Sequence, residues 1–216
     1  MGIISNKVYT PELDIKQLTA PSVQPVSLAE QKLYSRIDGT DEDSLITELI
    51  AVATLQCEDF VRGGFIKRTW SQSEDAGENL FASGVPFGWT RLNNGAMAIE
   101  IKNLMVSSIE SLKFYNIDDV ETVINSSLYR LDRANSWAPA RVVFDIGATI
   151  GDNTREYTQY ILSYTAGIEL AANVPVDIKQ AIKVTAHNWY ENRETMGSIP
   201  DSAKKILNGK YRIIEL

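Results

Sequence analysis

The sequence predicts an α+β fold in which a small bundle of N- and C-terminal helices brackets an inserted antiparallel β domain. Near both ends of the 216-residue chain, apolar residues recur every three or four positions, as in amphipathic helices. Between residues 65 and 164, short segments rich in β-branched and aromatic residues alternate with turn clusters, and no helical crossover separates them. Neither helical end is long enough to bury its apolar stripe alone, so we expect the two ends to pack on each other.

These observations divide the chain into four parts. Residues 1–26 contain three prolines and no helical period, which predicts an extended arm with a short strand at residues 7–10. Residues 27–64 and 174–208 form the predicted helical bundle. Residues 65–173 form the inserted β domain, and residues 209–216 form a C-terminal tail.

The first helix begins at a capping box. The Ser27 hydroxyl can accept from the first turn, while the Glu30 carboxylate reaches back to the Ser27 amide. The helix is predicted to end near Asp38 and Gly39. The residues expected on its buried face are Ala29, Leu33 and Ile37.

The second helix follows at once, with Thr40 or Asp41 as the expected cap and acidic residues in its first turn. Gly63 and Gly64 are predicted to close it in the left-handed region. Its predicted buried stripe is Leu45, Ile46, Leu49, Ile50, Ala53, Cys57, Phe60 and Val61. The residues expected on its other faces are Thr47, Glu48, Thr54 and Glu58.

Six segments of the central region have strand character. They are residues 96–101, 109–115, 122–124, 129–131, 141–144 and 157–164. Helix returns after Val174, with Pro175 tolerated in its first turn. Its predicted stripe is Ile178, Ala181, Ile182, Thr185, Ala186 and Trp189, and a last short helix is predicted at residues 200–208.

Composition excludes several classes of function. The net charge of −7 and the pI of about 4.9 argue against tight nucleic-acid binding, which needs clustered Lys and Arg. With Cys57 as its only cysteine, the chain can form no intrachain disulfide, which is compatible with a reducing cytoplasm. No membrane span and no signal peptide are predicted.

The sequence predicts no catalytic, metal or cofactor-binding residue. His187 has no nearby nucleophile motif, and Cys57 falls on the apolar stripe. The acidic stretch after Asp38 lacks the glycine and the glutamate of a calcium loop, so it is interpreted as helix capping. The chain contains no nucleotide-binding motif. Trp70, Trp89 and Trp137 could form a sugar platform, although packing is the usual role of tryptophan.

Charge is distributed unevenly between the two helical ends. Residues 38–48 hold five acids and no base, whereas residues 193–212 hold five bases and two acids. Opposite patches on one subunit can meet head-to-tail between neighbours and close a ring. The alternative interpretation is two solvated helix faces.

Several short motifs, in this order and spacing, resemble one protein family. They are residues 25–30 (PVSLAE), 36–43 (RIDGTDED), 66–70 (IKRTW), 129–131 (YRL), 160–167 (YILSYTAG), 174–182 (VPVDIKQAI), 187–194 (HNWYENRE) and 211–212 (YR). The chain resembles the head–tail connector (adaptor) proteins of long-tailed bacteriophages and their prophages. Two departures concern the β insertion: a proline common before the strand that begins at Leu104 is missing, and residues 81–94 form a longer stretch than usual.

The resemblance implies a structural virion protein, not an enzyme, assembled in the bacterial cytoplasm and located at the head–tail interface. It implies a ring, dodecameric in the family, that lies beneath the portal protein and extends the DNA channel. Its expected partners are the portal, a tail-side completion or stopper protein and further copies of itself, while DNA passes without specific binding and no membrane is involved. Candidate portal and subunit interface residues are Asp41, Glu42, Asp43, Lys204, Lys205, Lys210, Tyr211 and Arg212.

Alternative functions remain open at this point. Within the same class, the chain could be a tail terminator or stopper protein. In another class, its β domain could bind a glycan or receptor, which exposed stacking of Trp89 or Trp137 would favour. A hydrolase would need two carboxylates that face one cleft, and the sequence places no such pair.

Overall fold

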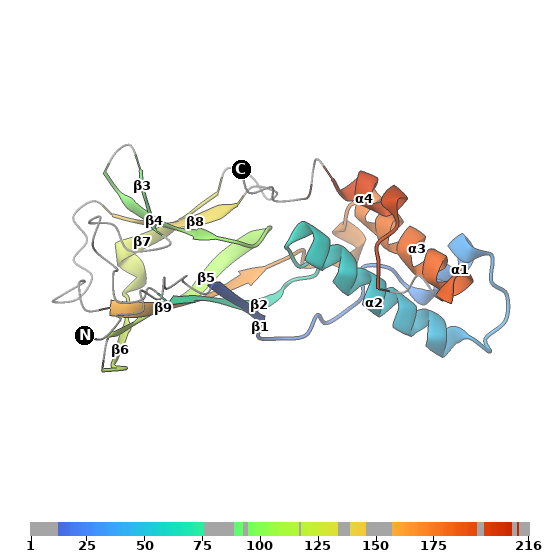
Figure 1. Cartoon of the computed structure of the whole chain (residues 1–216), viewed down its shortest axis with the longest axis horizontal. Coiled ribbons are helices and arrows are strands. Elements are labelled where there is room, and N and C mark those ends of the chain that lie inside the picture. Colours follow the sequence, from blue (N-terminus) through green and yellow to red (C-terminus); the bar gives the residue numbers. More distant parts are fainter. Residues whose placement is uncertain are drawn as a thin grey trace, which may run out of the picture.

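The computed structural model describes residues 13–75, 89–92, 95–116, 118–133, 139–145, 157–193, 197–208 and 211. The helices lie together at one end of an elongated molecule and the strands at the other (Figure 1). The helices are α1 (Leu28–Ser35), α2 (Asp43–Val61), α3 (Val176–Glu191) and α4 (Asp201–Leu207). The predicted α+β class, with N- and C-terminal helices packed on each other, is confirmed.

The strands form two antiparallel sheets. They are β1 (Leu13–Gln17), β2 (Arg68–Asp75), β3 (Trp89–Arg91), β4 (Met97–Ile101), β5 (Val106–Asn116), β6 (Glu121–Val123), β7 (Tyr129–Asp132), β8 (Ala140–Phe144) and β9 (Tyr157–Ala166). One sheet has the order β1-β2-β9-β5-β6 and the other β3-β4-β8-β7. All six predicted strand segments are present, within a few residues of their expected ends.

Strand β1 was not predicted. Leu13–Gln17 falls in the segment interpreted as an extended arm, yet it pairs with β2 along its whole length and forms one edge of the five-stranded sheet. Leu13 and Ile15 do alternate with Asp14 and Lys16, but over only four residues, and the prolines of the segment favour an extended arm. The strand predicted at residues 7–10 lies outside the described residues.

The long helices follow their predicted stripes closely. All six residues of the α3 stripe are buried, and α2 buries Ile46, Leu49, Ile50, Ala53, Cys57 and Val61, with Leu45 and Phe60 half-buried. Two residues assigned to other faces of α2 are also buried, which corrects the prediction. The Thr54 hydroxyl satisfies itself by donating to the Ile50 carbonyl at 2.8 Å, and Glu58 is paired as described below. No helix in the described ranges is long and apolar enough to cross a membrane.

The buried face of helix α1 differs from the prediction at Ala29 and Leu33, whereas Ile37, which follows the helix, packs against the core as predicted. The capping box of α1 is confirmed, with the Ser27 amide donating to Glu30 at 2.8 Å and the Glu30 amide donating to the Ser27 hydroxyl at 3.2 Å. The residue that it buries, however, is Gln31, whose amide donates to the Ser35 hydroxyl and the Lys183 carbonyl. Leu33, expected in the core, is 83% exposed.

The ends of the helices also differ in detail. The residue before α2 is Glu42, and neither Thr40 nor Asp41 caps the helix through its side chain. The left-handed residues that end α1 and α2 are Arg36 and Arg62 rather than glycines. Gly63 and Gly64 are needed for space instead, because a Cβ on Gly64 would lie 2.8 Å from the Arg68 guanidinium and from the Trp70 ring.

A buried ion pair lies where α2 meets the sheet. The Glu58 carboxylate accepts from the Phe65 amide at 2.7 Å and pairs with the Arg68 guanidinium, which lies 4.8 Å from the centre of the Trp70 ring. Burial raises the pKa of Glu58, and the hydrogen bond from Arg68 opposes that shift. The ion pair therefore links α2 of the helical half to β2 of the β half, in addition to the peptide chain that connects them.

Candidate interface surfaces

Cys57 and His187, for which the sequence predicts no catalytic role, lie on α2 and α3. Cys57 is fully buried, and burial raises the pKa of its thiol to about 12, so the thiolate is not accessible near neutral pH. His187 lies on α3 with its ring edge-on to Tyr34, the two ring centres being 5.7 Å apart. Within the described ranges, no three His, Cys, Asp or Glu side chains gather closely enough to hold a metal ion.

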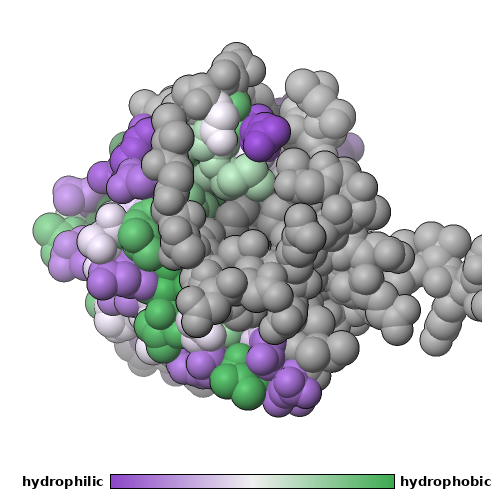
Figure 2. All heavy atoms as spheres, turned by 90° about the vertical axis from the view of Figure 1, so that its left-hand side faces the viewer, coloured by the Kyte–Doolittle hydropathy of each residue, from purple (hydrophilic) through white to green (hydrophobic). Residues whose placement is uncertain are grey.

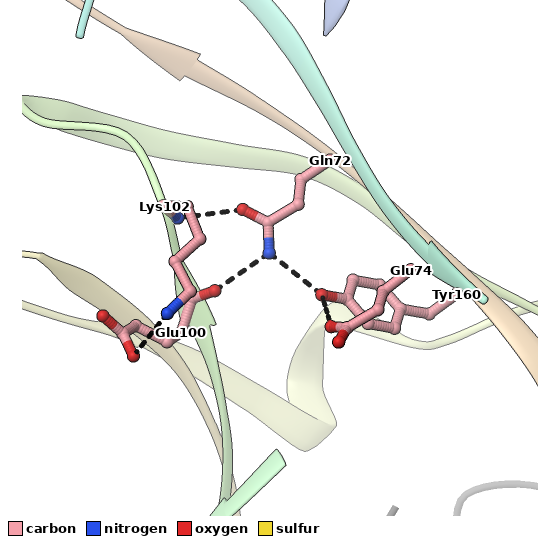
Figure 3. Close-up of polar contacts among 5 residues, drawn as sticks. All are labelled: Gln72, Glu74, Glu100, Lys102 and Tyr160. Atoms are coloured by element: carbon pink, nitrogen blue, oxygen red, sulfur yellow. Dashed lines mark hydrogen bonds and ion pairs between the residues drawn. The ribbon is translucent and has the colours of Figure 1, made fainter. Parts of the chain in front are cut away.

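A polar cluster joins the two sheets (Figure 3). At its centre Gln72 of β2, which is 1% exposed, accepts from the Lys102 amide and donates to the Glu100 carbonyl and the Tyr160 hydroxyl, each at 2.9 Å. Tyr160 in turn donates to Glu74 at 3.0 Å. Burial raises the pKa of both Glu74 and Tyr160. Gln72 of one sheet forms hydrogen bonds with backbone groups at the end of β4 in the other sheet. The cluster therefore holds the two sheets together, which is a structural role.

The three acidic candidates lie around the start of α2. Asp41 is exposed. Glu42 accepts from the Tyr190 hydroxyl of α3, and Asp43 pairs with Lys32 of α1 at 2.6 Å. Two of these carboxylates therefore hold the bundle together, and Asp41 is the one directed to solvent.

The five C-terminal candidates differ in accessibility. Lys205 is exposed and Lys204 lies 3.4 Å from Asp201 in an exposed pair, whereas Lys210 and Arg212 lie outside the described residues. Tyr211 is fully buried in the helical core, and its hydroxyl donates to Asp177 at the start of α3 at 2.5 Å. Tyr211 thus anchors the tail, and its side chain is covered by its own chain. The interface role of the eight candidates stays a prediction.

Sequence reasoning missed the exposed apolar residues of the helical half. Val52 and Leu55 on the solvent side of α2 are 40% and 52% exposed, and Leu33 of α1 is more exposed still. Glu48, Val52, Leu55 and Asp59 follow one another at helical spacing along this solvent side, opposite the buried stripe. The spacing was visible in the sequence, but the stronger stripe on the other side of α2 masked it.

A groove runs between α2 and the sheet beside the edge strand β1. It encloses about 680 Å³, and its apolar lining comprises Leu13, Ile15, Leu55 and Trp70. Asp59, Arg62 and Lys102 stand among its polar lining residues. The groove is continuous with the solvent side of α2, because Leu55 and Asp59 belong to both.

The end of the molecule away from the helices is mixed in character (Figure 2). Hydrophobic and hydrophilic residues lie among one another on the part of this face that described residues form. Its exposed apolar side chains include Val120 and Val123, at the β5–β6 hairpin. The side chains of Trp89 and Trp137, on which the glycan-binding alternative depends, lie outside the described residues.

The comparisons agree with this architecture. No protein-family model and no curated protein matches the chain. Among solved structures, the chain is similar to a chain from the neck of an empty gene transfer agent (GTA) particle computed with C6 symmetry, with a TM-score of 0.69 and 18% identity. It is also similar to chains from the virion of a native GTA particle (TM-score 0.67, 18% identity) and from the neck of a native GTA particle computed with C12 symmetry (TM-score 0.64, 17% identity). Each alignment covers 94% of this chain and 97% of the other. The overall fold is therefore shared over nearly the whole length of both chains.

Proposed function

We propose that this protein is a head–tail connector subunit, which forms a ring under the portal and extends the DNA channel toward the tail. The observation that carries the proposal is the shared fold, over nearly the full length, with chains of symmetric GTA necks. The order of the sequence motifs supports the same class independently. The chemistry of the chain is consistent with a structural role, since its buried polar groups clamp elements together.

The acidic balance of the chain suits a channel that DNA must traverse. A net charge of −7 favours passage over retention, because phosphates are repelled from acidic walls. Ring contacts would come from surfaces on the helical half, where exposed apolar and charged residues alternate.

The direct experiment is electron microscopy of the purified protein, alone and mixed with portal rings. The expected result is a ring of this protein stacked on the portal. Persistent monomers that leave the portal bare would contradict the proposal.

The proposed portal contact consists of the four C-terminal cations, Lys204, Lys205, Lys210 and Arg212, while the buried Tyr211 anchors the tail that carries them. Deleting everything after Ile199 would be a poor test, because Ala203, Leu207 and Tyr211 belong to the buried core. Charge reversal of Lys204, Lys205, Lys210 and Arg212 keeps the Tyr211 anchor and removes only the cations. We expect these reversals to weaken binding to portal rings in a salt-dependent way, whereas reversal of Lys113 on β5 serves as the control. Unchanged portal affinity would exclude a portal contact through these cations.

A further inference from the structure

Two outward faces of the helical half complement each other, and both are exposed with respect to the residues that the structure describes. The outer face of α2 consists of Glu48, Val52, Leu55 and Asp59, which span four positions of one stripe over about 16 Å. The outer face of α1 consists of Ala29, Leu33 and Arg36. Each face has apolar residues beside charged ones. The α1 face is positive at Arg36, and the α2 face is negative at Glu48 and Asp59.

The charged residues of both faces are available. Within the part of the chain that the structure describes, Arg36, Glu48 and Asp59 form no ion pair, although other charged residues of the same helices do. Arg36, in the αL conformation, directly follows α1 and lies three positions after Leu33. The α1 face therefore offers a cation next to an exposed leucine. The α2 face offers an acid on each side of two exposed apolar residues, so the two faces are complementary in both charge and polarity.

We infer that α1 of one copy docks on the outer face of α2 of the next copy, with Leu33 against Val52 and Leu55 and Arg36 against Glu48 or Asp59. The inference rests on the proposed ring. Because the two faces differ, the contact is heterologous: each copy uses α1 on one neighbour and α2 on the other, which is the requirement for closing a ring. The groove beside Leu55 gives the incoming apolar side chains additional room.

This contact explains the orientation of α1. The stripe expected to be buried was Ala29, Leu33 and Ile37. Only Ile37, which follows the helix, packs against the core, whereas α1 itself buries Gln31 and leaves Ala29 and Leu33 exposed. Docking on a second copy would remove the Leu33 side chain from water, which favours the contact.

Cross-linking between different single-cysteine variants tests the pairing. Leu33→Cys and Leu55→Cys proteins are purified separately and treated with a short bis-maleimide, alone and as a mixture. The natural thiol, Cys57, is buried with a pKa of about 12 and does not compete. We expect cross-linked dimers in the mixture and none with Leu33→Cys alone. A mixture of Leu33→Cys with Val123→Cys, whose residue lies on β6 at the other end, is the control and should give none.

Charge exchange tests the polar part of the contact. Arg36→Glu should abolish the ring, and combining it with Glu48→Arg or Asp59→Arg should restore it. Asp118→Arg, at an exposed turn between β5 and β6, is the matched charge control.

The outcomes separate this contact from the proposed function. Rings that form without cross-links in the mixture, or Leu33→Cys that cross-links to itself, would overturn the α1–α2 contact and leave the connector proposal standing. If no oligomer forms, either alone or on portal rings, the proposed function fails and this contact with it.

Discussion

At the scale of single residues, most polar side chains that the fold buries form hydrogen bonds or ion pairs between separate helices and strands. Gln72 is the clearest case, because one amide group takes the place of a neighbouring strand for the backbone at Glu100 and Lys102. Nothing in its sequence context distinguishes Gln72 from an exposed glutamine. Such residues become recognisable only when the register of two sheets is known.

Replacing Gln72 by leucine should be costly. The substitution leaves the Lys102 amide, the Glu100 carbonyl and the Tyr160 hydroxyl without the partner that each now has. We expect the free energy of unfolding in urea to fall by roughly 2–4 kcal/mol. Gln17→Leu, an exposed change on the edge strand β1, should alter it by less than about 0.5 kcal/mol. Equal effects of the two substitutions would show that the cluster does not clamp the sheets.

Tyr211 allows a similar test of the tail anchor. Tyr211→Phe keeps the buried ring and removes the hydroxyl that donates to Asp177. Because the acceptor is a carboxylate, we expect a loss of about 1.5–3 kcal/mol in the free energy of unfolding. Tyr115→Phe removes a comparable bond to Glu121 at an exposed site and should cost far less. A Tyr211→Phe protein as stable as the wild type would mean that packing alone holds the tail.

At the scale of elements, the buried face of the long helix α3 was predictable, whereas the face of the short helix α1 and the strand β1 were not. Helix α3 has 16 residues, so its six-residue stripe repeats often enough to fix the buried face. Helix α1 has eight, and two turns cannot distinguish the face of Leu33 from that of Gln31. Strand β1 depends on pairing with β2, a contact between segments more than 50 residues apart that a local pattern does not encode.

The same limit applies to the candidate interfaces. Charge indicated Asp41, Lys204 and Lys205 correctly as accessible residues, since an exposed charge is the default. Charge could not show that Glu42 is held by Tyr190 or Asp43 by Lys32, because those partners lie on other helices. Nor could charge indicate Leu33, which the sequence pattern assigns to a buried face, or Leu55, which the predicted buried stripe of α2 does not include.

The capping box of α1 should give the protein a defined acid sensitivity. The Ser27 amide lowers the pKa of Glu30, and the Ser27 hydroxyl and Lys179 act in the same direction. A carboxyl whose pKa is lower in the folded state stabilises that state above its ordinary pKa, and this contribution is lost as the pH falls through the lowered value. Glu30→Gln should therefore be less stable than the wild type at pH 7, and the difference in melting temperature should shrink as the pH falls below about 4. A difference that is constant from pH 7 to pH 3 would contradict this assignment.

At the scale of the whole molecule, the relative placement of the helical half and the β half depends on the junction. A ring needs every subunit to hold the same angle, so side chains that fix this placement bear on assembly although they lie far from the outer faces of α1 and α2. Glu58 near the end of α2 and Arg68 at the start of β2 form the buried pair there, with Gly64 leaving room for the guanidinium against Trp70.

Removing one partner of this pair should be far worse than removing both. Arg68→Met leaves the Glu58 carboxylate buried and uncompensated, and we expect a loss of about 3–5 kcal/mol in the free energy of unfolding by urea. The double variant with Glu58→Gln and Arg68→Met should recover a large part of that loss, because no buried charge remains. Lys67→Met, which breaks the exposed pair with Glu169, is the control and should cost no more than about 1 kcal/mol.

If the double variant is stable but no longer assembles into rings, the ion pair serves orientation rather than stability. If it is stable and assembles normally, the packing around Phe65 and Gly64 is sufficient to set the angle between the two halves.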